Sequence, residues 1–455
     1  MKKQTALVLS SAMISLTVLG GCGANTTNTT GASPSAAAST ATSTPAAKPV
    51  TIKYYNWDND TTGPATKKLI DDFQAKNPNI KVESIPLVPS NSVESMKKLD
   101  VMMTSGEQVD VVLYSNIDET MARAAQGVLA PLNDLYKKDN VNPDEEYYIN
   151  PKYKGNYYAT MYTASDWLVM LNEDALKDAG LKPPAYDWTW DDFRDYAKKL
   201  TKGEGNDKRY GAYFHTWGEY ANPIAYTDLK NPYLTADLKP VFNDPTFAYF
   251  FNLRRAMEKD DKSIKPYSDV VGGKLSYATE FISGKTSMLL SATFLVSSLA
   301  DKAKNPHTFK TIIAPMPRSS KNVEPGLTDF GASFVAIANN SKYKEEAYKF
   351  VRFMSTENNT RYDLSGWKKS DTKALLDRLF GGSKDVVDLD SLAALLSDKR
   401  MRTNMTTDVS APYQNQLKKV LENGFSTFIL DNKSAEDAQK FMMDEADKII
   451  KQNTK

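Results

Sequence analysis

Strands and helices alternate at the start of the folded part, and this order limits what the chain can fold into. Apolar runs predict strands at residues 50–55, 80–85 and 109–113, separated by helices with apolar residues at helical spacing. This order implies a parallel sheet with right-handed crossovers. Ligands bind beyond the carboxyl ends of such strands, which are followed here by Asn56-Trp57-Asp58 and Tyr114-Ser115.

A second α/β region follows the first. Strands are predicted at residues 168–171 and 331–338, residues 281–290 are predicted to be a helix end, a turn and a buried strand, and Thr189 is a predicted helix N-cap. An amphipathic helix is predicted over 343–354, and the last hundred residues are mostly helical by pattern. The predicted fold class is therefore α/β.

The N-terminal segment predicts the compartment. Lys2 and Lys3 precede a short apolar stretch that ends in Leu19-Gly20-Gly21-Cys22. This run resembles the lipobox of bacterial lipoproteins, and Cys22 is the only cysteine of the chain. We expect residues 1–21 to be a signal peptide and 22–49 to be a lipidated Cys22 with a disordered tether rich in Ala, Ser and Thr. The protein would then be extracytoplasmic and anchored to the cell membrane.

Composition excludes several kinds of chemistry. With one cysteine and two histidines, His215 and His307, a Cys/His zinc site is not expected, and a Ser-His-Asp hydrolase would need one of those two rings. A net charge of +1 gives no reason to expect nucleic acid as a partner. We predict no metal and no cofactor. Aromatic residues make up 11% of the chain. Most of them are expected to pack in the core, but such a content is also typical of a cleft whose rings stack on flat ligand faces.

Several landmarks occur in the order found in one family. They are residues 50–57, 69–82, 109–113, 171–181, 281–290 and 331–354. Together they resemble the family 1 extracellular solute-binding proteins of ABC importers, the group that contains maltose-type sugar-binding proteins. Each landmark is weak alone, but the resemblance covers nearly all of the chain after the tether.

The resemblance implies a periplasmic-binding-protein fold, in which two α/β lobes flank a cleft and close on ligand by hinge motion. We place the chain crossings near residues 161–167, 287–290 and 334–338. The first lobe would comprise 50–163 and 288–335, and the second lobe 164–287 and 336–455, the last part mostly helical.

Candidate ligand-binding residues are aromatic or polar and follow strand ends or lie at predicted crossings. A sugar needs flat rings for its apolar faces and planar polar groups for its hydroxyls. The candidates are Trp57, Asp58, Tyr114, Ser115, Tyr162, Asp166, Trp167, Trp217, Phe294, Asp329, Gly331, Ser333 and Trp367. Trp188 and Trp190 are interpreted as packing at a helix start.

Two departures from the family pattern leave the ligand class open. Phe294 stands where the family often has tryptophan, so a ring is kept but the indole donor is lost. Residues 362–369 replace a segment that is usually rich in proline and glycine. The identity, length and charge of a sugar therefore stay open.

We predict a monomeric, non-enzymatic protein that captures a mono- or oligosaccharide for membrane permease subunits. One alternative is a solute receptor that signals. Another is a secreted glycoside hydrolase, which needs two positioned carboxylates. With 56 acidic residues, carboxylate pairs can always be proposed, so their presence does not favour the hydrolase.

Overall fold

The computed structural model describes residues 49–356, 363–398, 400–403 and 411–454. The predicted signal peptide, Cys22 and the tether up to residue 48 lie outside these residues. The strands are β1 (Val50–Asn56), β2 (Ile80–Pro86), β3 (Val111–Tyr114), β4 (Lys152–Tyr153), β5 (Asn156–Tyr157), β6 (Ala159–Asn172), β7 (Tyr210–Tyr213), β8 (Thr286–Ala292), β9 (Thr311–Ala314), β10 (Leu327–Thr328), β11 (Phe330–Ile337), β12 (Leu364–Ser365) and β13 (Arg402–Thr403).

Eighteen α-helices are described between and after these strands. They are α1 (Gly63–Lys76), α2 (Ser92–Thr104), α3 (Ile117–Ala125), α4 (Asn133–Lys138), α5 (Pro143–Glu146), α6 (Glu173–Asp178), α7 (Trp190–Leu200), α8 (Gly218–Ala221), α9 (Pro223–Asp228), α10 (Pro245–Arg255), α11 (Tyr267–Gly272), α12 (Tyr277–Ile282), α13 (Val296–Ala300), α14 (Lys344–Thr356), α15 (Thr372–Phe380), α16 (Leu389–Leu396), α17 (Gln414–Leu430) and α18 (Ala435–Asn453).

One nine-stranded sheet connects the structure. Its order is β2-β1-β3-β11-β6-β8-β7, and β9 and β12 also pair with β6. β1 pairs in parallel with β2 and with β3, which confirms the predicted parallel unit. β11 is antiparallel to both of its neighbours, β3 and β6.

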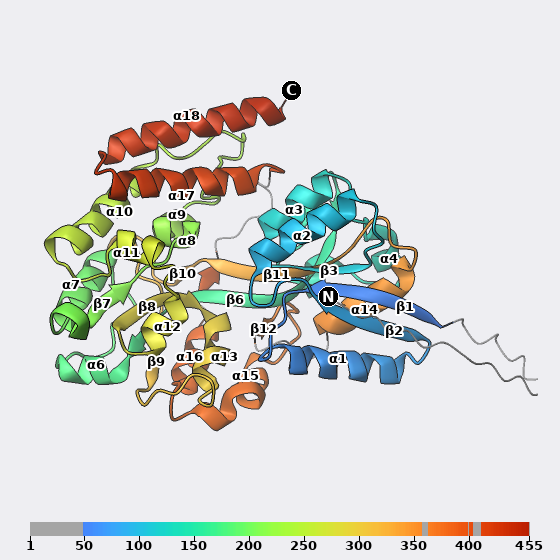
Figure 1. Cartoon of the computed structure of the whole chain (residues 1–455), viewed down its shortest axis with the longest axis horizontal. Coiled ribbons are helices and arrows are strands. Elements are labelled where there is room, and N and C mark those ends of the chain that lie inside the picture. The colour runs from blue at the N-terminus through green and yellow to red at the C-terminus, as the bar shows by residue number, and fades with distance from the viewer. Residues whose placement is uncertain (1–48, 357–362, 399, 404–410, 455) are drawn as a thin grey trace, which may run out of the picture. The chain divides into compact units, whose positions relative to one another are not determined.

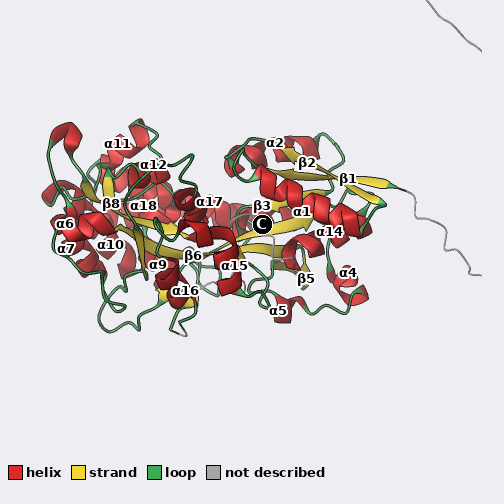
Figure 2. Cartoon of the chain, turned by 90° about the horizontal axis from the view of Figure 1, so that it is seen from below, coloured by secondary structure: helices red, strands yellow, loops and turns green. Residues whose placement is uncertain are grey.

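Strand β6 belongs to both parts of the sheet. All fourteen of its residues are buried. Residues 159–166 pair with β11, whereas residues 167–172 pair with β8 and β9. Helices gather around the two ends of this sheet as two groups (Figures 1 and 2). The first lobe contains β1, β2, β3 and β11 with α1–α4 and α14, and the second lobe contains β7, β8 and β9 with α6–α13, α17 and α18.

Two segments lie in the lobe other than the one predicted for them. Residues 288–314, expected in the first lobe, form β8 and β9 and pair with the second part of β6. Helix α14, expected in the second lobe, packs on β1 and α1, where Phe350 lies 5.6 Å from Tyr54 and 5.1 Å from Phe73, centroid to centroid. The predicted crossing at 161–167 coincides with β6. The chain next changes lobe between β9 and β11, not at 287–290, and it leaves the first lobe after α14. Local pattern predicts a strand but not its pairing partner.

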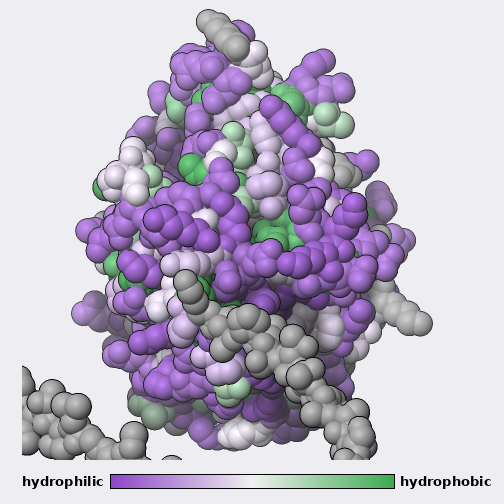
Figure 3. Space-filling view, turned by 90° about the vertical axis from the view of Figure 1, so that its right-hand side faces the viewer, coloured by the Kyte–Doolittle hydropathy of each residue, from purple (hydrophilic) through white to green (hydrophobic). Residues whose placement is uncertain are grey.

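No helix in the part of the chain that the structure describes is both long and apolar enough to cross a bilayer. The face in Figure 3 is mostly hydrophilic, with hydrophobic residues in small patches. Large exposed hydrophobic side chains are spread over several elements, including Val101 of α2 and Phe441 of α18.

Close packing of α7 on β7 fixes one edge of the second lobe. Thr189 caps α7 in a capping box with Asp192, as the sequence predicts for this N-cap. Where α7 meets β7, a Cβ atom added to Gly211 would lie 1.8 Å from the carbonyl oxygen of Ala197. Only glycine therefore allows this approach.

Replacing Gly211 by alanine should lower the free energy of unfolding by roughly 3 kcal/mol, because the helix and strand must separate to admit the methyl group. Urea denaturation measures the effect. Gly272→Ala is the control, since a Cβ there meets nothing within 4 Å, and its stability should match wild type. Equal stability of the two variants would contradict the packing argument.

Candidate functional site

A cavity of about 920 Å³ is lined by residues of both lobes. Its walls come from the loops after β1 and β3, from β6 and β11, from the loops around α8 and α9, and from α17. The carboxyl ends of β1 and β3 open into it, as expected for ligand sites on parallel strands. Its volume lies near the upper end of the range for small-molecule sites.

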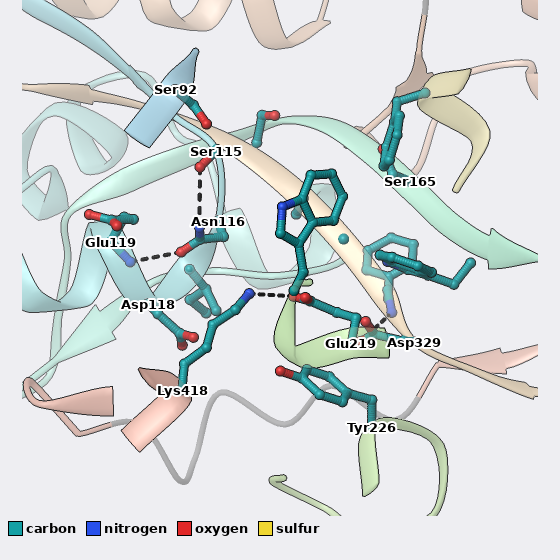
Figure 4. Close-up of a pocket in the computed structure, with 18 of the residues that line it drawn as sticks. Ser92, Ser115, Asn116, Asp118, Glu119, Ser165, Glu219, Tyr226, Asp329 and Lys418 are labelled. Atoms are coloured by element: carbon teal, nitrogen blue, oxygen red, sulfur yellow. Dashed lines mark hydrogen bonds and ion pairs between the residues drawn. The ribbon is translucent and has the colours of Figure 1, made fainter. Parts of the chain in front are cut away.

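The first-lobe wall is polar around the start of α3. Asn116 caps this helix, and its Oδ1 atom accepts from the backbone N–H of Glu119 at 2.9 Å. The Nδ2 atom of Asn116 donates to Ser115 Oγ at 3.1 Å. Asp118 follows in the first turn, and Figure 4 shows it pointing toward Lys418 of α17. The loop after β1 adds Trp57 to the same wall.

Aromatic rings form much of the second-lobe wall. The ring of Trp217 lies 5.2 Å from Tyr277, and Tyr277 lies 6.4 Å from Phe294. Phe294 lies 6.5 Å from Trp167, with the two rings nearly perpendicular. Behind them, His215 contacts Trp217 edge-on at 5.0 Å, and burial lowers the pKa of His215 to about 4, so this ring is neutral at pH 7. These rings form a connected wall, called here the aromatic wall: Trp167, Trp217, Tyr277 and Phe294.

A charged cluster faces the cavity. It consists of Asp118 of α3, Glu219 of α8, Lys418 of α17 and Asp329 of the β10–β11 turn. Lys418 Nζ lies 2.5 Å from Glu219 Oε1, and Figure 4 shows Asp118 and Asp329 nearby. Burial raises the pKa of Asp118 to about 6 and that of Asp329 to about 8, and Glu219 adds to both shifts. Burial opposes the charged form of Lys418, but the neighbouring Glu219 outweighs it and raises the pKa of Lys418.

Nine of the predicted binding residues line the cavity: Trp57, Ser115, Tyr162, Trp167, Trp217, Phe294, Asp329, Gly331 and Ser333. The structure brings them together from both lobes although they span 277 positions of the sequence, from 57 to 333. Their role in binding stays a prediction. Trp188 and Trp190 are buried packing residues, and the Trp188 indole N–H donates to the carbonyl of Pro315 at 2.9 Å.

Four predicted residues do not line the cavity. Asp166 lies between Ser165 and Trp167 on β6, so strand alternation turns it away from the cavity. Burial, and then the negative charge of Asp363, raise its pKa to about 7. Tyr114 is fully buried at the end of β3. Asp58 is buried behind the β1 loop, and Trp367 donates from its indole N–H to Glu146 at 3.3 Å, away from the cavity.

Sequence reasoning missed many of the polar residues of the site. Asn116 carried a usable signal, since an Asn followed three residues later by Glu119 is typical of a helix start. Residues of α17 gave none. The missed lining residues include Asn116, Asp118, Glu219, Tyr226, Tyr277, Asp363, Gln414 and Lys418.

The described residues do not assemble a metal centre. No group of three or more His, Cys, Asp or Glu in this part of the chain is arranged to hold a metal ion.

Comparison with known proteins agrees with this architecture. A model of bacterial extracellular solute-binding proteins matches residues 57–360, more than half of the chain. The sn-glycerol-3-phosphate-binding periplasmic protein UgpB of Escherichia coli K12 is 23% identical over 326 residues, covering 68% of this chain and 71% of that protein.

Solved structures share the fold over most of both chains. An ABC substrate-binding protein from Listeria monocytogenes in complex with cycloalternan has a TM-score of 0.72 at 22% identity, covering 89% of this chain and 99% of that one. UgpB from Mycobacterium tuberculosis in complex with glycerophosphocholine has a TM-score of 0.67 at 20% identity, with coverage of 89% and 99%.

Proposed function

Because this chain belongs to the bacterial extracellular solute-binding proteins, we propose that it captures a neutral carbohydrate or polyol and delivers it to the permease subunits of an ABC importer. The two lobes would close over the solute about β6 and β11, the strands that connect them. Binding would occur without turnover.

The observation that carries this proposal is the pairing of two kinds of wall around one cavity. The aromatic wall offers flat rings for the C–H faces of a sugar. Opposite it, carboxylates and amides such as Asp118, Asn116 and Gln414 can take hydroxyl hydrogen bonds in planar, two-centre geometry. A site with both features suits a polyhydroxylated solute.

Charge favours a neutral solute over a phosphate ester. The described lining residues include six carboxylates and three lysines, and none of them is an arginine. Lys418 is paired with Glu219, and Lys419 with Glu422. A phosphate entering this cavity would meet an excess of negative charge. Although relatives include a glycerol-3-phosphate-binding protein, the lining charges here favour solutes like the saccharide cycloalternan of the Listeria complex.

A thermal-shift screen tests the solute class. Maltotriose, mannobiose and D-mannitol are compared with glycerol 3-phosphate on the purified mature protein. A solute at 100 times its dissociation constant adds about 2.7 kcal/mol of stability, and we expect this from a neutral solute.

The saccharide should be recovered uncleaved after a day of incubation with the protein. Stabilisation by glycerol 3-phosphate alone, or multiple-turnover cleavage, would refute the proposal.

Trp57 and Trp217 should stack on the solute from the two lobes. Replacing either by alanine should weaken binding roughly tenfold or more, since a stacked ring contributes about 0.5–1.5 kcal/mol beyond its area and truncation leaves a gap. Titration calorimetry measures the affinity. Trp188→Ala is the matched control: it should cost roughly 3–5 kcal/mol of stability while affinity stays within a few-fold. Wild-type affinity in both folded cavity variants would place the binding surface elsewhere.

We also propose that Cys22 is lipidated and that the tether lets the folded part reach the permease. The lipobox-like run Leu19-Gly20-Gly21-Cys22 and the polar segment after it support this. Cys22→Ser should release the protein from the membrane fraction of cells. A variant that still sediments with membranes like wild type would argue against the anchor.

A further inference from the structure

Helix α17 brings a part of the chain outside the family match into the cavity. The match ends at residue 360, whereas α17 begins at Gln414. It packs on α18 and α10 of the second lobe and also contacts α3 of the first lobe (Figure 1). Its cavity-lining residues are Gln414, Asn415, Gln416, Lys418, Lys419 and Glu422.

Polar contacts of α17 connect the two lobes directly. Gln414 donates from Nε2 to Asp118 Oδ1 of α3 at 2.6 Å. The other amide atom of Gln414, Oε1, accepts from Asn231 Nδ2 of the second lobe at 3.2 Å. One turn further, Lys418 pairs with Glu219 of α8 at 2.5 Å. Asp118 is therefore held from the opposite lobe.

The charges around Lys418 do not balance. Asp118, Glu219 and Asp329 surround this lysine, so three carboxylates share its positive charge. Lys418 lowers the pKa of both Asp118 and Asp329. Glu119 and Glu422 add further negative charge, but Glu119 pairs with Arg123 and Glu422 pairs with Lys419. Hence the cluster carries excess negative charge whenever all three carboxylates are ionised.

We propose that Gln414 and Lys418 of α17 are positioning residues that hold Asp118 of the first lobe and Glu219 of the second lobe at the polar end of the cavity, so that closure around a solute takes up a proton from solvent. This proposal rests on the proposed function, because a bound solute drives the closure. When the lobes separate, Asp118 leaves Gln414 and gains water, and the repulsion within the cluster falls. Closure reverses both changes, which favours the protonated carboxyl.

The sign of the pH dependence follows from the direction of the shifts. Asp118 and Asp329 have pKa values of about 6 and about 8 in this structure, above the ordinary 3.8. The closed form therefore binds more protons than an open form in which these groups are hydrated. Affinity should be greatest near pH 4 and should fall as the pH rises to about 8, above which it levels off.

Calorimetric titration with maltotriose between pH 5 and pH 8.5, in buffers of different ionisation enthalpy, measures affinity and proton uptake together. Wild type should lose at least tenfold in affinity from pH 5 to pH 8, since Asp118 alone, with a pKa of about 6, contributes about one unit over that range, and it should take up protons on binding. Lys418→Met should lose roughly tenfold more than wild type over the same range, because the remaining carboxylates repel one another without a cation. Lys418→Arg should restore the wild-type profile.

Two further variants separate this role from a general effect on folding. Lys448→Met removes an exposed lysine that pairs with Glu445 at 2.5 Å on α18, and it should leave the profile unchanged. Asp118→Asn removes one titrating group, so its profile should be flatter than wild type even if Lys418→Met does not fold. A loss of affinity in Lys418→Met that is equal at every pH would overturn the inference, as would pH-independent binding by wild type.

A second readout is carboxyl carbon NMR titration of the full mature chain, with and without a saccharide of the panel. The pKa of Asp329 should rise when the saccharide binds, and it should rise further in Lys418→Met, because the lysine opposes that shift. A pKa of Asp329 that saccharide binding leaves unchanged, or a rise that Lys418→Met leaves unchanged, would refute the inference. Failure of the whole saccharide panel counts instead against the proposed function, so the two failures are distinguishable.

Discussion

The pairing of one long strand with both lobes is the constraint on which the rest of the structure depends. β6 contributes residues 159–166 to the first lobe and 167–172 to the second, and all of it is buried. Because its backbone pairs on both sides, neither lobe can shift along it without breaking register. The cavity lies where the two parts of this strand meet, so residues of β6 and β11 supply its floor.

Around that floor the cavity combines aromatic rings with carboxylates. Moving the face of an aromatic ring out of water is favourable, whereas burying a carboxylate is unfavourable unless it is paired or protonated. The raised pKa values of Asp118 and Asp329 express this cost. A solute rich in hydroxyl groups reduces it, since each hydroxyl replaces a hydrogen bond that water would have made.

Sequence reasoning reached the elements and nine of the residues that line the cavity, for reasons that differ by residue. Helix α1 follows from Pro64 in its first turn and from buried Leu69, Ile70 and Phe73 at helical spacing, all local signals. β8 was predicted as a strand but in the wrong lobe, because pairing with residue 167 of β6 is a contact over more than a hundred positions. Asp166 was predicted as a binding residue because it lies at a predicted chain crossing. Successive side chains of a strand point to opposite faces, so its neighbours Ser165 and Trp167 line the cavity and Asp166 does not.

Helix α17 shows why the other cavity-lining residues could not be predicted from the sequence. Its apolar face packs on its own lobe and predicts a helix, but nothing local indicates that Gln414 meets Asp118, 296 positions away. Strands β2 to β11 lie within the family match, whereas this helix lies beyond it. The cavity of this chain is therefore lined jointly by strands within the family match and by a helix outside it.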